Sequence, residues 1–356
     1  MIGVSIIGAG FARSTQAPAF AACAGAQLMA IASGHRENAE TVAREFRIGF
    51  VGEWREVIAR DDVDLVCVTT PPVFHREMTL AAIHAGKAVL CEKPLAMSAA
   101  ETDEMRRAAR EANVLAHVDH ELRFVPARQR ARELIAANEL GRVRHAKVIF
   151  RTDSRAAGRE WSWWSDEESG GGVLGAIGSH AVDALSWLTG AQVSEVFCRL
   201  ATHVAERVDE RTGKARRVTS DDEANLLLRL AGSDAVAETA TAALSLSMIE
   251  AGESAHRVEI FGERGALKIE GARLWRAEAG GGHWEEIEVE QSPLAAGMRD
   301  GEWSRGFTVF SQKIIDALRE GRNSVEGAAT FDDGHRTQLV LDAARRSHAE
   351  GRSITL

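Results

Sequence analysis

The first 120 residues alternate short apolar strands with helical patterns, and this alternation restricts the fold more than any other feature. It is typical of a parallel sheet that carries helices on its faces. The strands expected are residues 3–7, 27–32, 65–69, 88–91 and 114–118. The helices expected are residues 16–24, 38–46, 54–59, 75–85 and 99–111. Ser98 and Glu101 form a capping-box pattern before the last helix, and Gly86 is placed to end the one before it.

The pattern changes after about residue 122, where a helix at 126–138 is expected. Strand-like segments separated by turns then predict a mostly antiparallel sheet with one covered face. These segments are residues 143–151, 193–202, 223–230, 235–246, 256–261, 266–269, 274–277 and 286–289. Helices are expected at 308–320 and 332–350, and the polar segment 203–222 is expected to be a long hairpin loop.

With 356 residues, the chain is long enough for two domains. The fold class expected is an α/β N-terminal domain with a Rossmann-type parallel sheet, joined to a C-terminal α+β domain with a large, mostly antiparallel open sheet. Residues 1–122 form the dinucleotide-binding domain in this interpretation, and residues 123–356 the domain for substrate binding and oligomerisation.

Composition excludes several classes of protein. A net charge of −9 without a long basic stripe argues against a nucleic-acid partner. No segment is apolar enough to span a membrane, and no secretory signal is expected. The four widely spaced cysteines suggest neither a disulfide framework nor a metal site, so we expect a cytoplasmic protein with reduced thiols. Because there is no tyrosine, tyrosine-based proton chemistry is excluded.

A glycine loop follows the first strand directly and precedes a helix. In a G-x-G turn, backbone N–H groups approach a pyrophosphate, and the helix N-terminus favours its negative charge. The third position of the usual fingerprint is Arg13 rather than a small residue, but the neighbouring Ala12 is small. A plain tight turn is the alternative. The cofactor contacts predicted in this loop are Gly8, Gly10, Phe11, Ala12 and Arg13.

The second strand ends without the acidic residue that binds the ribose 2′-hydroxyl of NAD. It ends instead in Ser33, Gly34 and, two residues later, Arg36. A hydroxyl followed by a guanidinium suits a 2′-phosphate, so these residues favour NADP as cofactor over NAD. The alternative is that Arg36 is a solvated arginine at a helix start.

Two further turns lie at the carboxyl ends of parallel strands, where open α/β sheets bind their ligands. The first contains Thr70, Pro71 and His75, and the second is Glu92-Lys93-Pro94. With the glycine loop, and with Gly170-Gly171-Gly172 leading to Gly178-Ser179-His180 and Asp183, they make the chain resemble the glucose–fructose oxidoreductase/inositol dehydrogenase/rhizopine-catabolism (Gfo/Idh/MocA) family.

The resemblance implies that Lys93 lies near the nicotinamide and stabilises a developing alkoxide. It implies that His180 is the general acid/base and that Asp183, on the same helix face, orients it or binds substrate. Thr70, Pro71, His75 and Glu92 join the cofactor contacts on the same basis. Each has a structural alternative: a surface lysine, a core histidine or a structural aspartate.

One position departs from the family pattern, which often has an aspartate four residues before this histidine. Here Ala176 occupies it, so either Asp183 or a carboxylate elsewhere, such as Asp119 or Glu121, substitutes for it, or the reaction differs from simple alcohol oxidation. The substrate contacts expected are His120, Arg123, Trp163, Trp164 and Ser179. Aromatic faces stack on sugar rings. Hinge salt bridges and a subunit-contacting aromatic loop are the alternatives.

The function expected is hydride transfer between NAD(P) and a secondary alcohol or ketone of a sugar, cyclitol or related polyol. One alternative is an NAD-dependent enzyme that oxidises its substrate transiently to cleave a glycoside or eliminate a group. Another is a non-enzymatic NAD(P)-sensing protein, because fold does not determine function. A homodimer or homotetramer through the C-terminal sheet is expected as well.

Overall fold

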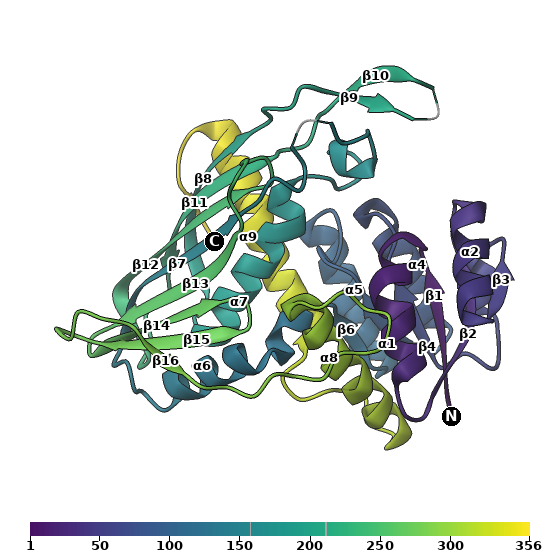
Figure 1. Ribbon diagram of the computed structural model, residues 1–356, viewed down its shortest axis with the longest axis horizontal. Coiled ribbons are helices and arrows are strands. Elements are labelled where there is room, and N and C mark those ends of the chain that lie inside the picture. The colour runs from purple at the N-terminus through teal and green to yellow at the C-terminus, as the bar shows by residue number, and fades with distance from the viewer. Residues whose placement is uncertain (157, 211) are drawn as a thin grey trace. The chain divides into compact units, whose positions relative to one another are not determined.

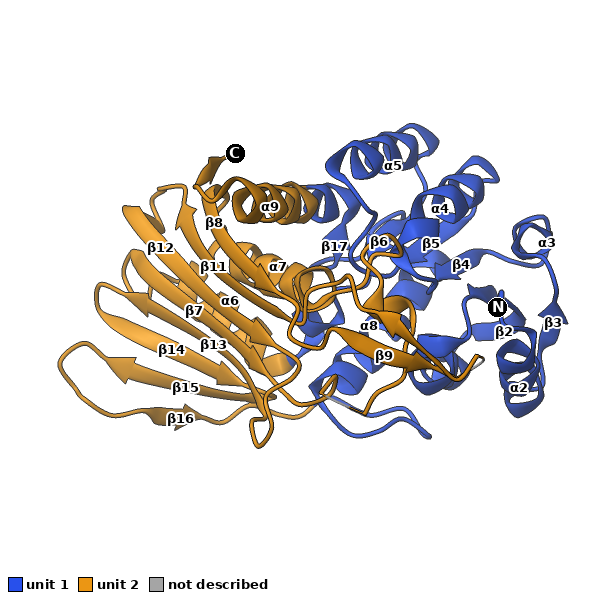
Figure 2. Cartoon of the chain, turned by 90° about the horizontal axis from the view of Figure 1, so that it is seen from above, with its two compact units in different colours: residues 1–125, 292–335 blue, residues 126–291, 336–356 orange. Residues whose placement is uncertain are grey.

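The computed structural model describes residues 1–156, 158–210 and 212–356. The chain divides into two compact units, each discontinuous in sequence (Figure 2). Unit 1 contains residues 1–125 and 292–335, and unit 2 contains residues 126–291 and 336–356.

Unit 1 is built on a seven-stranded sheet with the order β17-β6-β5-β4-β1-β2-β3. All its strands are parallel except the short edge strand β17. The strands are β1 (Ile2–Ile7), β2 (Ala26–Ala32), β3 (Gly49–Val51), β4 (Leu65–Val68), β5 (Ala88–Cys91), β6 (Ala116–Val118) and β17 (Ala329–Thr330). The helices are α1 (Ala17–Ala22), α2 (Arg36–Phe46), α3 (Trp54–Ile58), α4 (His75–His84), α5 (Ala99–Ala112) and α8 (Glu302–Arg319) (Figure 1).

Alternate residues of each central strand enter separate cores on the two faces of this sheet. In β4, Leu65 and Cys67 join the core formed with α1, α2 and α8, while Val66 and Val68 join the core formed with α3, α4 and α5. A strand that is apolar on both faces reads as a continuous apolar run, which is why the parallel sheet was recognisable in the sequence. The parallel α/β prediction for this region is confirmed.

The helix ends follow local signals. Ser98 Oγ accepts a hydrogen bond from the backbone N–H of Glu101 at 3.3 Å, which confirms the predicted cap of α5. Helix α8 begins at Glu302, earlier than the 308–320 expected. Its first turns approach the chain closely enough that a Cβ on Gly306 would lie 2.5 Å from the carbonyl oxygen of Glu121.

Unit 2 contains a nine-stranded sheet with the order β16-β15-β14-β13-β7-β12-β11-β8-β18. Only β7 and β12 pair in parallel, so the mostly antiparallel sheet predicted for the C-terminal region is confirmed. The strands are β7 (Val143–Arg151), β8 (Val193–Ala201), β11 (Glu223–Leu230), β12 (Val236–Ser247), β13 (Ala255–Gly262), β14 (Gly265–Glu270), β15 (Arg273–Glu278), β16 (Glu285–Ile287) and β18 (Ile354–Thr355). A separate hairpin of β9 (Glu206–Asp209) and β10 (Lys214–Arg217) occupies the predicted hairpin segment.

Helices cover one face of this sheet. Helix α6 (Pro126–Ala136) packs against β14 and β15, and α7 (Ser179–Thr189) packs against β7. In helix α9 (Phe331–Glu350), Ser347 Oγ accepts a hydrogen bond from the backbone N–H of Cys198 on β8. Along β11, Leu226 is buried on the covered face, whereas Leu227 points to the other side and is 61% exposed. No helix among the described residues is long and apolar enough to cross a membrane.

Candidate active site

The glycine loop follows β1 and crosses the end of β4. Gly8 has φ +114°, and a Cβ there would lie 2.6 Å from the backbone and side chain of Thr69. Thr69 Oγ1 donates a hydrogen bond to the carbonyl oxygen of Gly8 at 2.8 Å. A Cβ on Gly10 would meet nothing within 4 Å. The fold therefore requires glycine at position 8, whereas at position 10 it leaves open space in front of a helix start.

The residues after this loop separate into buried and exposed positions. Ala12 is fully buried in the core against the sheet, so the small residue needed for close helix–strand packing stands there. Arg13 is exposed and pairs with Glu45 on α2 at 2.9 Å, and Phe11 is exposed as well. An exposed backbone at a helix N-terminus with no side chain in front of it suits a pyrophosphate.

The end of β2 presents polar groups without an acid. Ser33 Oγ accepts a hydrogen bond from the backbone N–H of His35 at 3.2 Å, which shapes the turn around Gly34. Arg36 opens α2 with its side chain 76% exposed, and it pairs with Glu40 at 2.6 Å. Its guanidinium also lies 5.4 Å from the centre of the Phe50 ring, and an exposed guanidinium of this kind can also bind a phosphate.

His75 joins the turns after β4 and β5. Its ring nitrogens lie 2.8 Å from the carbonyl oxygen of Thr70 and 3.0 Å from that of Pro94, and the side chain is completely buried. Burial lowers the pKa of His75 to about 4. A neutral ring carries a single N–H, so His75 can donate to only one of these two carbonyl oxygens, and it packs between the Thr70-Pro71 turn and the lysine turn.

The lysine turn follows β5 and carries a buried acid next to Lys93. The Lys93–Pro94 peptide bond is cis. The backbone N–H of Glu92 donates to the carbonyl oxygen of Val68 at 2.9 Å, which extends the sheet to this point. Glu92 Oε2 accepts a hydrogen bond from the backbone N–H of Lys93 at 3.3 Å, and Lys93 itself is half-buried.

Two more acids lie at the end of the neighbouring strand β6. The backbone N–H of Asp119 donates to the carbonyl oxygen of Cys91 at 2.8 Å, which places Asp119 beside Glu92. The amide nitrogen Nε2 of Gln16 donates to Glu92 Oε1 at 3.2 Å and to Asp119 Oδ2 at 3.3 Å. Glu121 is buried at the start of the turn that follows.

The junction residues expected to contact substrate are both buried. His120 and Arg123 belong to the stretch after β6, and the guanidinium of Arg123 lies 3.5 Å from the carboxylate of Asp333. This ion pair is of the kind that the alternative interpretation of the segment expected.

The histidine predicted as acid/base belongs to unit 2. Ser179, His180 and Asp183 all lie on α7, and all three side chains are buried, with His180 only 4% exposed. Ala176 precedes them in a π-helical turn, Leu174–Gly178, which leads into α7. His180 and Asp183 are three positions apart and share a helix face.

The start of this helical segment is held by an aspartate that the sequence did not single out. Asp221 Oδ2 accepts a hydrogen bond from the backbone N–H of Leu174 at 2.7 Å, and burial raises its pKa to about 6. A Cβ on Gly172 would lie 2.4 Å from Asp221 Oδ1, and one on Gly171 would lie 2.5 Å from the carbonyl oxygen of Trp164. Close packing against Asp221 therefore explains Gly172, and close packing against the Trp164 backbone explains Gly171.

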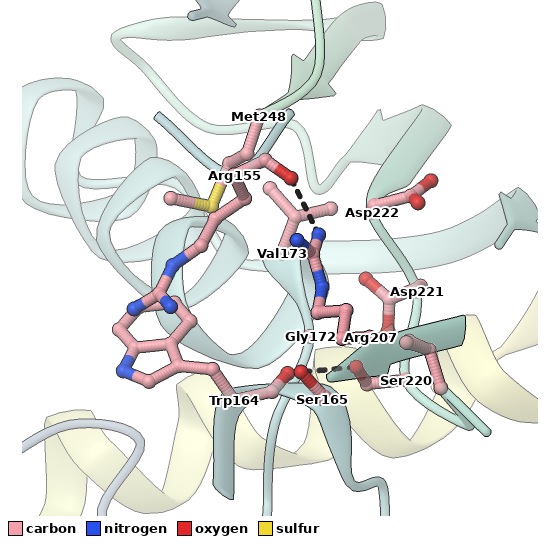
Figure 3. A pocket seen from close by; sticks show the side chains of 11 residues that line it. Arg155, Trp164, Ser165, Gly172, Val173, Arg207, Ser220, Asp221, Asp222 and Met248 are labelled. Carbon is pink, nitrogen blue, oxygen red and sulfur yellow. Dashed lines mark hydrogen bonds between the residues drawn. The ribbon is translucent and has the colours of Figure 1, made fainter. Parts of the chain in front are cut away.

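A small polar pocket surrounds this aspartate within unit 2 (Figure 3). Its volume of about 20 Å³ is enough for about one water molecule, so the pocket is not a sugar site by itself. Arg155 places its guanidinium 4.3 Å from the centre of the Trp164 ring, and Arg207 donates to the carbonyl oxygen of Arg155. The rings of Trp163 and Trp164 lie 5.0 Å apart at a tilt.

The predicted site residues thus fall into two groups. In unit 1, the glycine loop, the Thr70 turn and the lysine turn follow β1, β4 and β5, which are neighbours in the sheet and end at the same edge. In unit 2, the predicted acid/base His180 lies on α7, and Trp163 and Trp164 precede this helix in the chain. Gln16 and Asp221 were missed; in retrospect Gln16 is a polar residue on an apolar helix face, which is a usable signal.

No group of His, Cys, Asp or Glu side chains suited to a metal ion occurs in the described part of the chain. A Rossmann-type sheet with a glycine loop at its carboxyl edge is the architecture of a dinucleotide-binding protein. Residues 2–120 match the model described as an oxidoreductase family with an NAD-binding Rossmann fold, and residues 128–268 match the GFO/IDH/MocA C-terminal domain. The chain belongs to the Gfo/Idh/MocA oxidoreductase family.

Individual relatives agree with this assignment. An uncharacterized oxidoreductase of Synechocystis is 35% identical over 98% of this chain and 94% of its own length. The crystal structure of an oxidoreductase domain protein from Kribbella flavida is 30% identical with a TM-score of 0.85, covering 99% of this chain and 98% of that one. Levoglucosan dehydrogenase in complex with NADH and L-sorbose is 26% identical with a TM-score of 0.87, covering 100% and 98%.

Proposed function

We propose that the protein transfers hydride between a nicotinamide cofactor and a secondary alcohol or ketone of a sugar, cyclitol or related polyol. The observation that carries the proposal is the position of Lys93 on the same sheet edge as the glycine loop, one strand beyond the Thr70 turn. The similarity to levoglucosan dehydrogenase over the whole chain supports the substrate class.

The residues of unit 1 fit the cofactor. The open space at Gly10 and the exposed helix start leave room for a pyrophosphate, and the Thr70-Pro71 turn follows the neighbouring strand. When bound, the nicotinamide accepts or gives the hydride. The residues of the protein bind and orient the cofactor and the substrate, and they move the proton.

The chain's own residues divide the remaining work. The ammonium group of Lys93 polarises the substrate oxygen and stabilises negative charge that develops on it. An imidazole nitrogen of His180 takes the hydroxyl proton in oxidation and returns it in reduction. Asp183, on the same face of α7, orients the imidazole or binds a neighbouring substrate hydroxyl. The glycine stretch and Asp221 hold the helical segment that carries both.

A lysine comparison tests this assignment. Lys93→Ala is expected to reduce kcat about 100- to 1,000-fold, as loss of one donor to a developing oxyanion does, and to leave cofactor affinity within about threefold. Lys87 precedes the same strand at its opposite end, where it donates to the carbonyl oxygen of Arg60, so Lys87→Ala is the matched control. The assay follows reduced cofactor with a panel of sugars and cyclitols that includes levoglucosan. Wild-type rates in Lys93→Ala would contradict the assignment.

We propose NADP as the preferred cofactor, with NAD as the alternative. The support is the exposed guanidinium of Arg36 beside Ser33, with no acid at the end of β2. Charge-assisted bonds to a 2′-phosphate contribute about 1.5–3 kcal/mol, so Arg36→Ala should weaken NADPH binding about 10- to 150-fold and leave NADH binding unchanged. Arg44→Ala, on the same helix, is the control. Tighter binding of NADH than NADPH to the wild type would favour NAD.

A second candidate function is a reaction in which oxidation is transient and the cofactor returns to its starting state. The observation that favours it is Ala176, where the resemblance leads one to expect a carboxylate. A cofactor that co-purifies and never accumulates in reduced form during turnover would support this candidate. Accumulation of reduced cofactor in proportion to oxidised substrate would exclude it.

We propose further that the protein is a homodimer or homotetramer formed through the uncovered face of the nine-stranded sheet. On this face Phe197, Leu227 and Ala243 are neighbours in register on three adjacent strands. Leu227→Lys is expected to dissociate the oligomer, while Val208→Lys on the exposed hairpin is not. A monomeric sedimentation profile of the wild type at micromolar concentration would refute the proposal.

Four free, buried cysteines support a location in the reducing cytoplasm.

A further inference from the structure

Three buried carboxyl groups meet directly beside Lys93. Glu92 follows β5, and Asp119 and Glu121 follow the adjacent strand β6, with Gln16 bridging the first two. Asp119 is 1% exposed and Glu121 is 3% exposed, and Gln16 has no exposed surface. Acids at this degree of burial are rare unless they are paired or protonated. We call Glu92, Asp119, Glu121 and Gln16 together the carboxyl cluster.

Several acceptor atoms in the carboxyl cluster lack a donor. Gln16 Oε1, Asp119 Oδ1 and Glu121 Oε2 are buried without a hydrogen-bond partner. Buried polar atoms in native structures almost always have one, so these three together require an explanation. A proton on a carboxyl group turns one acceptor into a donor, so a retained proton reduces the number of unsatisfied acceptors in the cluster.

The charges around the cluster also indicate that one of its carboxyl groups is protonated. The positive charge of Lys93 favours the ionised form of the three acids. Glu302 at the start of α8 and the buried thiol of Cys67 on β4 also face these acids, and neither brings a positive charge. Burial and the charges of Glu92 and Glu121 raise the pKa of Asp119 well above its usual range. Burial and the charge of Glu92 raise the pKa of Glu121 to about 8. The cluster therefore does not ionise fully at neutral pH.

We propose that the carboxyl cluster retains a proton at neutral pH and thereby positions the Lys93 ammonium toward the substrate oxygen, with Glu121 as the residue that releases this proton. The inference rests on the proposed role of Lys93. With the proton held, the cluster attracts Lys93 weakly and leaves its charge for the developing alkoxide. When Glu121 ionises, the added negative charge draws the ammonium toward the cluster and repels the alkoxide. Glu92, Asp119, Glu121 and Gln16 are positioning residues.

The retained proton is tested first without any substrate. Infrared difference spectra of the wild type between pH 7 and pH 9 should show loss of a protonated-carboxyl C=O band. Glu121→Gln should lack this loss. Glu104→Gln, the same change at an exposed acid that pairs with Arg76, should keep it. Absence of the band from the wild type at pH 7 would overturn the proposal, as would the same loss of the band between pH 7 and pH 9 in Glu121→Gln.

The action on Lys93 is tested by labelling and by kinetics. Acetylation of Lys93 by acetic anhydride, followed by mass spectrometry from pH 7 to 10, should turn on at lower pH in Glu121→Gln than in wild type. With levoglucosan as probe, kcat of the wild type should fall about tenfold per pH unit above pH 8 relative to Glu121→Gln, with KM similar in both at pH 7. Identical labelling curves and identical profiles in the two proteins would overturn the proposal.

Two provisions keep the outcomes separate. Asp119→Asn is the second variant if Glu121→Gln does not fold, and it should likewise reduce the infrared change. If Lys93→Ala retains full turnover while the infrared and labelling results hold, the proposed role of Lys93 fails and the retained proton stands. If Lys93→Ala is inactive and the infrared change is absent, the cluster proposal fails and the proposed function stands.

Discussion

Replacing Gly10 by alanine adds one methyl group at a position where the protein leaves space for it. The added Cβ has no protein atom within 4 Å, and the residue lies in the first turn of a helical segment. Alanine is favoured over glycine in a helix by about 0.5–1 kcal/mol, so the free energy of unfolding should be unchanged or slightly higher. Any loss of function in this variant therefore arises from what binds in front of the loop.

Replacing Gly8 by alanine, in contrast, is expected to lower the free energy of unfolding. There φ is +114°, and the new Cβ would lie 2.6 Å from the carbonyl carbon and oxygen of Thr69. Backbone strain of about 1–3 kcal/mol and overpacking of about 1–3 kcal/mol add to an expected loss of about 2–6 kcal/mol. This is a large part of the stability of a typical domain, about 5–15 kcal/mol.

Two measurements on both variants separate structure from binding. Guanidinium unfolding should show a clear loss for Gly8→Ala and none for Gly10→Ala. Titration with NADPH and NADH, followed by cofactor fluorescence, should show Gly10→Ala binding about 5- to 150-fold more weakly, because a methyl group against the pyrophosphate costs about 1–3 kcal/mol. Wild-type affinity in Gly10→Ala would refute the location of the pyrophosphate at this loop.

Gly172→Ala, with φ +110° and a Cβ 2.4 Å from Asp221 Oδ1, should lose about 2–4 kcal/mol of unfolding free energy. Gly190→Ala, with φ +71° and open space around it, should lose only about 1 kcal/mol, and equal losses in urea unfolding would contradict the clash. Because the pKa of Asp221 is raised to about 6, the native state holds this proton while the unfolded chain releases it. The associated stability is present below about pH 4 and is lost as pH rises to 6, on the order of 3 kcal/mol. Asp221→Asn should remove this fall in pH-dependent denaturation; an unchanged slope would locate it elsewhere. Burial lowers the pKa of His117 to about 4, so its contribution is present above about pH 6.5 and is lost as pH falls toward 4. His117→Gln should make this acid destabilisation smaller, as thermal melts from pH 7 to 4 would show, and an equal loss in both proteins would contradict it.

Much of the architecture was predictable from local pattern. The strands β4 and β5 are short apolar runs between turn residues, and the residue bounds expected for them are within one residue of those observed. The antiparallel strands of unit 2 alternate buried and exposed residues, as in β11, so their positions and covered face follow from a period of two. Signals of this kind act over a few residues and need no knowledge of the rest of the chain.

Elements with weak local signals were not found. β3 and β17 are three and two residues long, and each forms only because a neighbouring strand already presents free backbone groups. The earlier start of α8 depends on Gly306 meeting the backbone at Glu121. A glycine inside a helix lowers the local preference for that helix, so pattern alone predicted a later start.

The sequence by itself determined the class of chemistry. A glycine loop directly after the first strand, and a lysine turn after a later parallel strand, are local motifs whose relation to the sheet edge follows from strand direction alone. They predict a dinucleotide site with an ammonium group beside it.

The tertiary structure decided which side chains surround that ammonium group. Gln16 lies 76 positions from Glu92 and 103 from Asp119, and it reaches both because β5 and β6 are adjacent and the segment after β1 crosses their ends. Strand order and packing, not sequence spacing, set such contacts. Burial likewise arises only when the whole unit has folded, and burial is what raises the pKa of Asp119 and Glu121.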